Sequence, residues 1–354
     1  MKIALVGPPL SGKTTLFQAV SGQFAPPAHG VQEHVAVVKV PDKRLDFLAA
    51  LYKPKKYTEA SIEMVDIPGF SQVTAARQAE FRRYIPSLKL CDALVAVVRA
   101  FNNPDVPPYR DRIDPKADLD ELYAELIFAD LEQTMNRIQR LEKDLTKPTR
   151  THDQERRELA LFQRCREALE DEKPLSSAIH TDEERKLVRG FRFLTEMPLV
   201  VVVNVSDTDA ANPPVFDSPH ARAVIGLCAR TEAEIAQLAP EDRRAFLDDL
   251  GVGEPARERL IHACYDALGL ISFLTCGPEE VHAWSIRRGQ TAVEAAGEVH
   301  SDMARGFIKA ETVAFEDLQA AGDMKAAKAA GKVRLEGKNY VVQDGDVILF
   351  KFNV

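Results

Sequence analysis

The stretch Gly7–Thr14 reads Gly-Pro-Pro-Leu-Ser-Gly-Lys-Thr and matches the phosphate-binding spacing G-x-x-x-x-G-K-[ST]. It follows the apolar run Ile3–Val6 and precedes the helix-like run Thr15–Val20. In a strand, loop and helix of this kind, backbone N–H groups surround a phosphate, the lysine reaches the β and γ phosphates, and the hydroxyl ligates Mg²⁺. We therefore predict a nucleoside triphosphate site formed by Gly7, Pro8, Pro9, Leu10, Ser11, Gly12, Lys13, Thr14 and Thr15.

A second element, Val65-Asp66-Ile67-Pro68-Gly69, places the pattern D-x-x-G at the end of a predicted strand. In nucleotide switches the aspartate reaches Mg²⁺ through water, and the glycine N–H contacts the γ-phosphate. We expect Thr14 and Asp66 to hold Mg²⁺ and Gly69 to contact nucleotide. Lys13 is the candidate for balancing transition-state charge, and the pattern identifies no catalytic base.

A third element, Asn204-Val205-Ser206-Asp207, resembles the base-reading N-K-x-D motif, with valine in place of its lysine. Asn204 and Asp207 are therefore the candidates for the base. An aspartate in the last position can accept hydrogen bonds from guanine N1–H and its amino group, whereas adenine offers no such pair of donors. Without the lysine this preference is weakened, so ATP and GTP both remain open as ligand or substrate.

Size, charge and cysteine spacing set limits on the class of protein. The 354 residues are enough for two or three domains, and the net charge of −8 argues against broad electrostatic capture of nucleic acid. We therefore expect no DNA partner, and any RNA contact must be local. The five cysteines form no C-x-x-C pair, and the N-terminus lacks a signal-peptide pattern. A cytoplasmic protein with no membrane span is the expectation.

Short β-type runs recur with helix-like segments between several of them, at Ile3–Val6, Val35–Val40, Ser61–Asp66, Ala93–Val98 and Leu199–Asn204. This alternation predicts an α/β, doubly wound domain. From Asp118 the chain changes to charged helices with an apolar stripe formed by Phe128, Leu131, Met135, Ile138, Leu141 and Leu145. A second stripe, Leu159, Phe162, Cys165 or Arg166, and Leu169, predicts an antiparallel coiled-coil hairpin.

The helical segment is not a basic arm, because acidic side chains outnumber basic ones between Arg110 and Glu196. Most of its charges are expected to form a solvated face, although the cluster Arg156, Arg157, Arg164 and Arg166 could contact RNA or an acidic partner. A third helix is expected around residues 183–194. From about Gly269 a small mixed α/β domain begins, and Asp344-Gly345 predicts a closing hairpin.

The chain resembles the YchF family, the Obg-like ATPases, over nearly its whole length. Besides the nucleotide motifs, the resemblance rests on blocks in one order, namely Glu232–Ile235, Leu268–Leu270, Glu280–Trp284, Ala296–Asp302, Gly306–Glu311 and Gly337–Val347. It implies a P-loop NTPase domain over residues 1–110 and 197–268, an inserted helical coiled-coil arm over 111–196 and a β-grasp TGS domain over 269–354. It also implies Mg²⁺-dependent hydrolysis of ATP, often in preference to GTP, and places Cys228 and Ala229 at the base.

The resemblance further implies association with ribosomes, with ribosome or RNA contact through the arm and the TGS domain. Several positions depart from the family pattern. Leu10 replaces an asparagine, residues 24–31 lack the switch threonine, and residues 70–77 form a shortened second switch. Pro108 replaces a histidine, whereas Phe70 fits the hydrophobic residue found where a water-orienting glutamine would stand. His29 and His34 lie near the missing threonine.

Three functional hypotheses follow from the motifs and their departures. The first is a Mg²⁺-dependent nucleotide triphosphatase with slow turnover, coupled to the ribosome, to translation or to stress regulation. The second is a nucleotide-sensing binding module with little or no hydrolysis. Lys13 and Asp66 are compatible with these two, while the missing threonine favours the second. The third is an RNA-binding scaffold with a vestigial nucleotide pocket, for which Lys13→Ala would leave partner binding unchanged.

Overall fold

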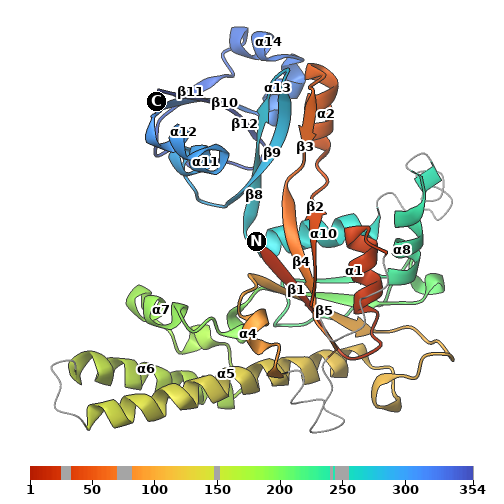
Figure 1. Ribbon diagram of the computed structural model, residues 1–354, viewed down its shortest axis with the longest axis vertical. Helices are drawn as coiled ribbons and strands as arrows, with labels where there is room; N and C mark the ends of the chain where they lie inside the picture. Colours follow the sequence, from red (N-terminus) through yellow and green to blue (C-terminus); the bar gives the residue numbers. More distant parts are fainter. Residues whose placement is uncertain (25–32, 70–81, 147–151, 240–241, 244–254, 354) are drawn as a thin grey trace. The chain divides into compact units, whose positions relative to one another are not determined.

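The computed structural model describes residues 1–24, 33–69, 82–146, 152–239, 242–243 and 255–353 (Figure 1). The chain folds into two compact units, each made of two sequence segments. Unit 1 contains residues 1–36 and 64–256, and unit 2 contains residues 37–63 and 257–354. The boundaries expected at residues 110, 197 and 268 are finer than this division and stay predictions.

The first sheet has six strands in the order β2-β4-β1-β5-β6-β7. Their bounds are β1 Lys2–Val6, β2 His34–Lys39, β4 Ser61–Asp66, β5 Ala93–Arg99, β6 Leu199–Asn204 and β7 Ala223–Leu227. The pairs β1–β5, β5–β6 and β6–β7 are parallel. Every residue of β5 and β6 is buried, as expected for central strands covered on both faces. All five apolar runs predicted as strands are confirmed.

Helices α1 (Lys13–Ser21), α4 (Ile85–Leu88) and α8 (Ala229–Gln237) follow strands or loops of unit 1. Short 3-10 turns lie at η1 (Tyr109–Asp111) and η4 (Asp207–Asp209). Val6, Val98 and Val203 belong to one buried cluster that also includes Leu122 and Leu126 of helix α5. Because parallel strands end at the same edge of a sheet, this core fixes the loops after β1, β5 and β6 beside one another.

The arm consists of α5 (Pro115–Leu145) and α6 (His152–Glu170), which lie side by side in Figure 1, followed by η2 (Leu175–Ser177), α7 (Asp182–Arg189) and η3 (Leu194–Glu196). Ile138, Leu141, Phe162, Cys165 and Leu169 share one buried cluster, so the predicted hairpin of two apolar stripes is confirmed. The third helix is shorter than expected, because a capping box starts α7 and Gly190 follows its last residue.

The predicted first stripe is wrong at two positions. Phe128 and Met135 are 54% and 44% exposed. The buried positions between Leu126 and Ile138 are instead Asp130 and Thr134. The Asp130 carboxylate accepts hydrogen bonds from the backbone N–H groups of Leu194 and Thr195, at 2.9 and 2.8 Å, which makes its burial tolerable. The true stripe is therefore partly polar.

Unit 2 carries the second sheet, in the order β11-β10-β12-β8-β9-β3. Its strands are β3 (Lys56–Thr58), β8 (Leu270–Cys276), β9 (Glu280–Arg287), β10 (Phe307–Ala314), β11 (Arg334–Glu336) and β12 (Asp346–Phe352). Its helices are α2 (Lys43–Tyr52), α11 (Ala292–Val299), α12 (Ser301–Arg305), α13 (Phe315–Ala321) and α14 (Met324–Ala329), and α10 (Ala256–Ala267) leads into β8. The parallel β8–β12 pair with antiparallel neighbours gives the expected β-grasp arrangement.

The hairpin predicted at Asp344-Gly345 is wrong. Strand β12 pairs with β10 and β8, and not with the residues before the turn. The Asp344 carboxylate accepts hydrogen bonds from the Ser272 N–H at 2.8 Å and from the Arg44 guanidinium at 2.7 Å. The turn is thus held by residues distant in sequence. Among the helices of the described part of the chain, none combines the length and the apolar character that a membrane span needs.

Candidate nucleotide-binding site

The loop between β1 and α1 requires its two glycines. Gly7 has φ 146°, and a Cβ there would lie 2.3 Å from the Val97 carbonyl oxygen. Gly12 has φ 95°, and a Cβ there would lie 2.1 Å from the Asn204 amide nitrogen. Gly12 is also the N-cap of α1, where no side chain caps the helix and its first turn holds no acidic residue. The helix therefore begins with unsatisfied N–H groups, the arrangement that binds phosphate.

Lys13 is buried, and its ammonium donates a hydrogen bond to the Pro8 carbonyl at 2.8 Å. Burial lowers its pKa from 10.5 to about 8, although the nearby Asp66 carboxylate acts in the opposite direction. Gly69 approaches the same ammonium, because a Cβ on Gly69 would lie 2.9 Å from Lys13 Nζ and 2.9 Å from the Pro9 Cα. The structure thus brings the D-x-x-G glycine onto the phosphate loop, beside a cation that lacks solvation.

Thr14 and Asp66, the two predicted Mg²⁺ ligands, are in contact. Thr14 Oγ1 donates to Asp66 Oδ2 at 2.8 Å, and Thr14 is exposed. Asp66 is 8% exposed, and within the described residues its Oδ1 has no hydrogen-bond partner. Burial raises the pKa of Asp66, while the Thr14 hydroxyl, Lys13 and His34 act to lower it. A buried carboxylate oxygen left unsatisfied beside a hydroxyl fits a hard divalent cation.

The described residues contain no group of three or more His, Cys, Asp or Glu side chains that could hold a metal. Mg²⁺ commonly takes one or two protein ligands together with waters and substrate phosphates. The donor set of Thr14 and Asp66 is therefore compatible with the ion that the phosphate loop implies.

Asn204 connects the phosphate loop to the segment after β7. Its Nδ2 donates to the Ser11 carbonyl at 2.9 Å, and its Oδ1 accepts from the Ala229 N–H at 2.9 Å. The side chain is 4% exposed. Both ends of the amide are therefore engaged with backbone, so Asn204 positions the loop around the site. Its predicted contact with a base stays a prediction.

The other candidate base contacts leave the sheet at the same edge as Asn204. Asn204, at the end of β6, pairs with Leu227 at the end of β7. The residue after Leu227 is Cys228, the N-cap of α8. Cys228 and Ala229 are buried, and Val205, in the place of the motif's lysine, is 1% exposed. Asp207 is exposed in η4, and its Oδ1 accepts the Thr208 N–H at 3.0 Å. Asp207 is thus the candidate base contact that solvent reaches most readily.

Leu10 has φ 62° and is 54% exposed. A left-handed backbone is uncommon for leucine and more readily tolerated by asparagine. Of the remaining loop residues, Ser11 is fully buried with no hydrogen-bond partner for its hydroxyl among the described residues, and Thr15 is half-buried in α1.

Some predicted features fall outside the described residues, namely His29, Phe70, residues 25–31 of the first switch and residues 70–77 of the second. His34 is described, and its ring lies edge-on to Phe17 with centroids 6.5 Å apart.

Sequence reasoning missed Arg99, which is 3% exposed and donates hydrogen bonds to the carbonyls of Phe101, Val106 and Pro107. A cation closing an otherwise apolar strand was its only signal. It shapes the loop after β5, next to the phosphate loop.

Two family models match the chain. One, described as a 50S ribosome-binding GTPase, covers residues 2–132, and the C-terminal YchF GTPase model, described as a protein of unknown function, covers residues 270–353. The ribosome-binding ATPase YchF of Bacillus subtilis is 40% identical over 99% of this chain and 98% of its own length. Obg-like ATPase 1 of Oryza sativa subsp. japonica is 34% identical over 100% of this chain and 92% of its own.

A solved structure agrees with these sequence relatives. The Schizosaccharomyces pombe YchF GTPase matches with a TM-score of 0.84 and 27% identity, covering 99% of this chain and 97% of that one. The comparisons confirm the predicted fold class, a P-loop NTPase domain with a helical coiled-coil insertion and a C-terminal TGS-like domain.

Proposed function

Because the chain belongs to the YchF family of Obg-like ATPases, we propose that it binds ATP or GTP with Mg²⁺ at the loop Gly7–Thr14 and hydrolyses it slowly. The observation that carries the proposal is the convergence of Lys13, Thr14, Asp66 and Gly69. Lys13 Nζ lies close to Gly69, and Thr14 bonds to Asp66. Two motifs distant in sequence, the phosphate loop and D-x-x-G, thus meet where a triphosphate would lie.

Each residue has a physical role in this proposal. The N–H groups of the loop and of the first turn of α1 hold the phosphates, and Lys13 balances their charge. Thr14 and Asp66 would hold Mg²⁺, which neutralises phosphate charge. Asn204 keeps the loop in shape through its bond to the Ser11 carbonyl. Asp207, Cys228 and Ala229 are the proposed contacts to the base.

Slow turnover is part of the proposal because fast phosphoryl transfer needs donors and a positioned water where charge develops. The sequence lacks a threonine in residues 24–31 and has Phe70 where a water-orienting glutamine would stand. These departures also sustain the alternative, a nucleotide sensor with little or no hydrolysis. Phosphate release distinguishes the two, because a sensor would bind nucleotide without releasing phosphate above background.

We further propose that nucleotide state is coupled to the ribosome or to translation and stress regulation, in the cytoplasm. Support comes from the Bacillus subtilis relative, which is named a ribosome-binding ATPase and matches along almost the whole chain. The arm and the TGS domain are the proposed surfaces for ribosome or RNA contact.

The test is a calorimetric titration of ATP and GTP, with and without Mg²⁺, combined with phosphate release in the same samples. Native protein is compared with Lys13→Ala. A matched control is Lys116→Ala, because Lys116 is 64% exposed on α5 and pairs with Asp120, four residues further along. We expect binding by native protein and the control and its loss in Lys13→Ala. Equal binding by all three would refute the site.

A further inference from the structure

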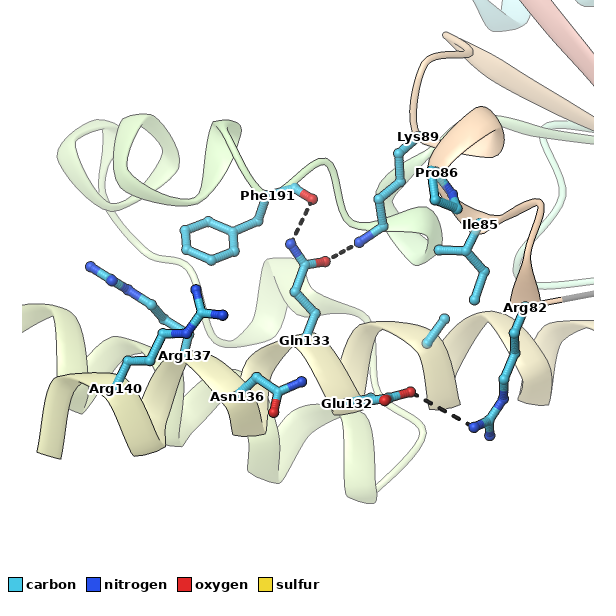
Figure 2. Close-up of a pocket in the computed structure, with 11 residues that line it drawn as sticks. Arg82, Ile85, Pro86, Lys89, Glu132, Gln133, Asn136, Arg137, Arg140 and Phe191 are labelled. Atoms are coloured by element: carbon cyan, nitrogen blue, oxygen red, sulfur yellow. Dashed lines mark hydrogen bonds and ion pairs between the residues drawn. The ribbon is translucent and has the colours of Figure 1, made fainter. Parts of the chain in front are cut away.

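A cavity of about 460 Å³ lies within unit 1, between the arm and the segment around α4 (Figure 2). Its walls are the face of α5 that carries Gln133 and Arg140, the segment from Arg82 to Lys89, and Phe191 after α7. None of these residues takes part in the phosphate loop. The cavity is therefore separate from the nucleotide site described above.

The lining is strongly cationic, although the chain as a whole carries a net charge of −8. Arg82, Lys89, Arg137 and Arg140 face a single carboxylate, Glu132. Among the residues that the structure describes, only Arg137 is closely neutralised, by Glu158 outside the cavity at 2.7 Å, whereas Arg82 and Glu132 are 3.9 Å apart. Positive charge collected in one hollow of an acidic protein is a local anion-binding feature.

Lys89 and Arg140 have no carboxylate at ion-pair distance among the residues described here. Lys89 donates a hydrogen bond to Gln133 Oε1, a neutral acceptor, and burial lowers the pKa of its ammonium, although Asp130 acts in the opposite direction. The Asp130 carboxylate is committed to Leu194 and Thr195. A partly desolvated ammonium without a counterion gains most from an anionic ligand.

Polar and aromatic groups accompany the cations. Gln133 bridges Lys89 and the Phe191 carbonyl, to which its Nε2 donates at 3.1 Å, as Figure 2 shows. Asn136 and Arg140 follow three and seven residues later on α5, so the polar stripe extends for about 10 Å at 1.5 Å per residue. The half-buried ring of Phe191 forms one wall. A stacked strand rises 3.4 Å per nucleotide, so the stripe spans about three nucleotides.

We propose that this cavity is a second phosphate-recognising site, which binds a short segment of single-stranded RNA. Arginine and lysine suit phosphate oxygens, amides can read unstacked bases, and an aromatic ring can stack on them. An acidic peptide would pair with the cations but offers no base for the Asn136 amide to read or for the Phe191 ring, which also packs against Phe162 and Phe193, to stack on. The inference rests on the proposed function only in taking the ribosome as the source of the RNA.

The experiment measures fluorescence anisotropy of a labelled single-stranded oligoribonucleotide with the full chain at several salt concentrations. Excess MgADP keeps the phosphate loop occupied. Arg140→Gln and Lys89→Gln each remove one proposed phosphate contact, so affinity falls at least about threefold and the slope of log K against log salt decreases by about 0.7. Arg140 has no described partner to lose, which makes its variant the safer one for folding.

Two further variants make the test specific. Glu132→Gln removes the only carboxylate among the described lining residues, so RNA binding strengthens. Lys116→Gln removes the same charge from α5 about 36 Å along the helix from Arg140 and leaves both affinity and slope unchanged. Equal weakening by Lys116→Gln and Arg140→Gln, or no effect of Arg140→Gln and Glu132→Gln, overturns the proposal.

Competition experiments distinguish an RNA strand from a small phosphate compound as the ligand of this cavity. Unlabelled RNA displaces the probe at low concentration, whereas inorganic triphosphate and AMP do so only weakly if the site takes a strand. Equal displacement by triphosphate would overturn the RNA assignment and identify a small-anion site. MgATP affinity is measured by calorimetry on the same preparation, so failure of the nucleotide proposal and failure of this one give different results.

Discussion

Replacing Lys13 with methionine is expected to stabilise the nucleotide-free protein while abolishing nucleotide binding. The ammonium is buried, and its pKa falls from 10.5 to about 8 in the folded chain. At 1.36 kcal/mol for each pKa unit, the charged form costs the folded state about 3 kcal/mol below pH 8. Methionine keeps a similar apolar stem without that charge. The variant also loses the hydrogen bond to the Pro8 carbonyl and the cation near Asp66, so we expect a net gain of about 2 kcal/mol at pH 7.

The lowered pKa of Lys13 also determines how native stability changes with pH. Because the folded pKa is the lower one, the unfolded chain binds more protons between pH 8 and 10.5, and native stability rises with pH there. The cost of the charge is fully present below pH 8 and disappears above 10.5. The advantage of Lys13→Met over native protein must therefore shrink by about 3 kcal/mol between pH 7 and pH 10.5.

The assay is urea unfolding of both proteins at several pH values, because the difference between them cancels the titration of every group that Lys13 does not influence. Lys116→Met is the control for removing an exposed lysine, and its effect stays within about 0.5 kcal/mol. MgATP at a hundred times its dissociation constant should stabilise native protein by about 2.7 kcal/mol and leave Lys13→Met unaffected. A destabilised Lys13→Met at pH 7, or an advantage that does not change with pH, would show that the buried charge of Lys13 does not destabilise the folded chain.

Three further perturbations test other parts of the site. Leu10→Asn should raise the free energy of unfolding by about 1 kcal/mol, because φ 62° suits asparagine better than leucine, and urea titration measures it. Asn204→Ala should lower that free energy by about 2 kcal/mol and weaken ATP binding, since the Ser11 carbonyl and the Ala229 N–H both lose their partner. Unchanged stability and affinity would contradict the role of Asn204 in positioning the phosphate loop. Asp66→Asn should make ATP affinity nearly independent of Mg²⁺ in calorimetry, whereas an undiminished Mg²⁺ effect would exclude Asp66 as a ligand.

The parts of the fold with strong local signals could be predicted from the sequence. The central strands are continuous apolar runs, and the phosphate loop is a fixed spacing of glycine, lysine and threonine whose backbone geometry leaves little choice. Gly7 and Gly12 show why, because a Cβ at either position would collide with Val97 or Asn204. Those collisions involve residues far along the chain. The motif spacing indicates that glycine is needed but does not identify these residues.

Other parts depend on partners that leave no local pattern. Asp130 and Thr134 occupy buried positions of α5, and only the distant backbone of residues 194–195 satisfies the Asp130 carboxylate. A search for apolar residues at helical spacing therefore selects Phe128 and Met135 wrongly. Likewise, β3 joins the C-terminal sheet by pairing with β9, more than two hundred residues away, and nothing in residues 56–58 indicates that pairing.

The candidate site divides in the same way. Lys13, Thr14 and Asp66 could be identified from motifs because their chemistry demands those residue types. The engagement of both ends of the Asn204 amide could not, since it depends on where Ser11 and Ala229 lie in space. The cationic cavity beside α5 could not be predicted from the sequence either, because its residues are scattered over three segments of a chain whose net charge is negative.

A crystal structure of the full chain with Mg²⁺ and a non-hydrolysable ATP analogue would show whether the loop Gly7–Thr14 binds a triphosphate. We expect the backbone of Gly7–Thr14 to hold the phosphates, with Lys13 Nζ turned from the Pro8 carbonyl to a phosphate oxygen and Mg²⁺ beside Thr14 and Asp66. A nucleotide bound elsewhere, or phosphates that leave Lys13 on the Pro8 carbonyl, would contradict this expectation.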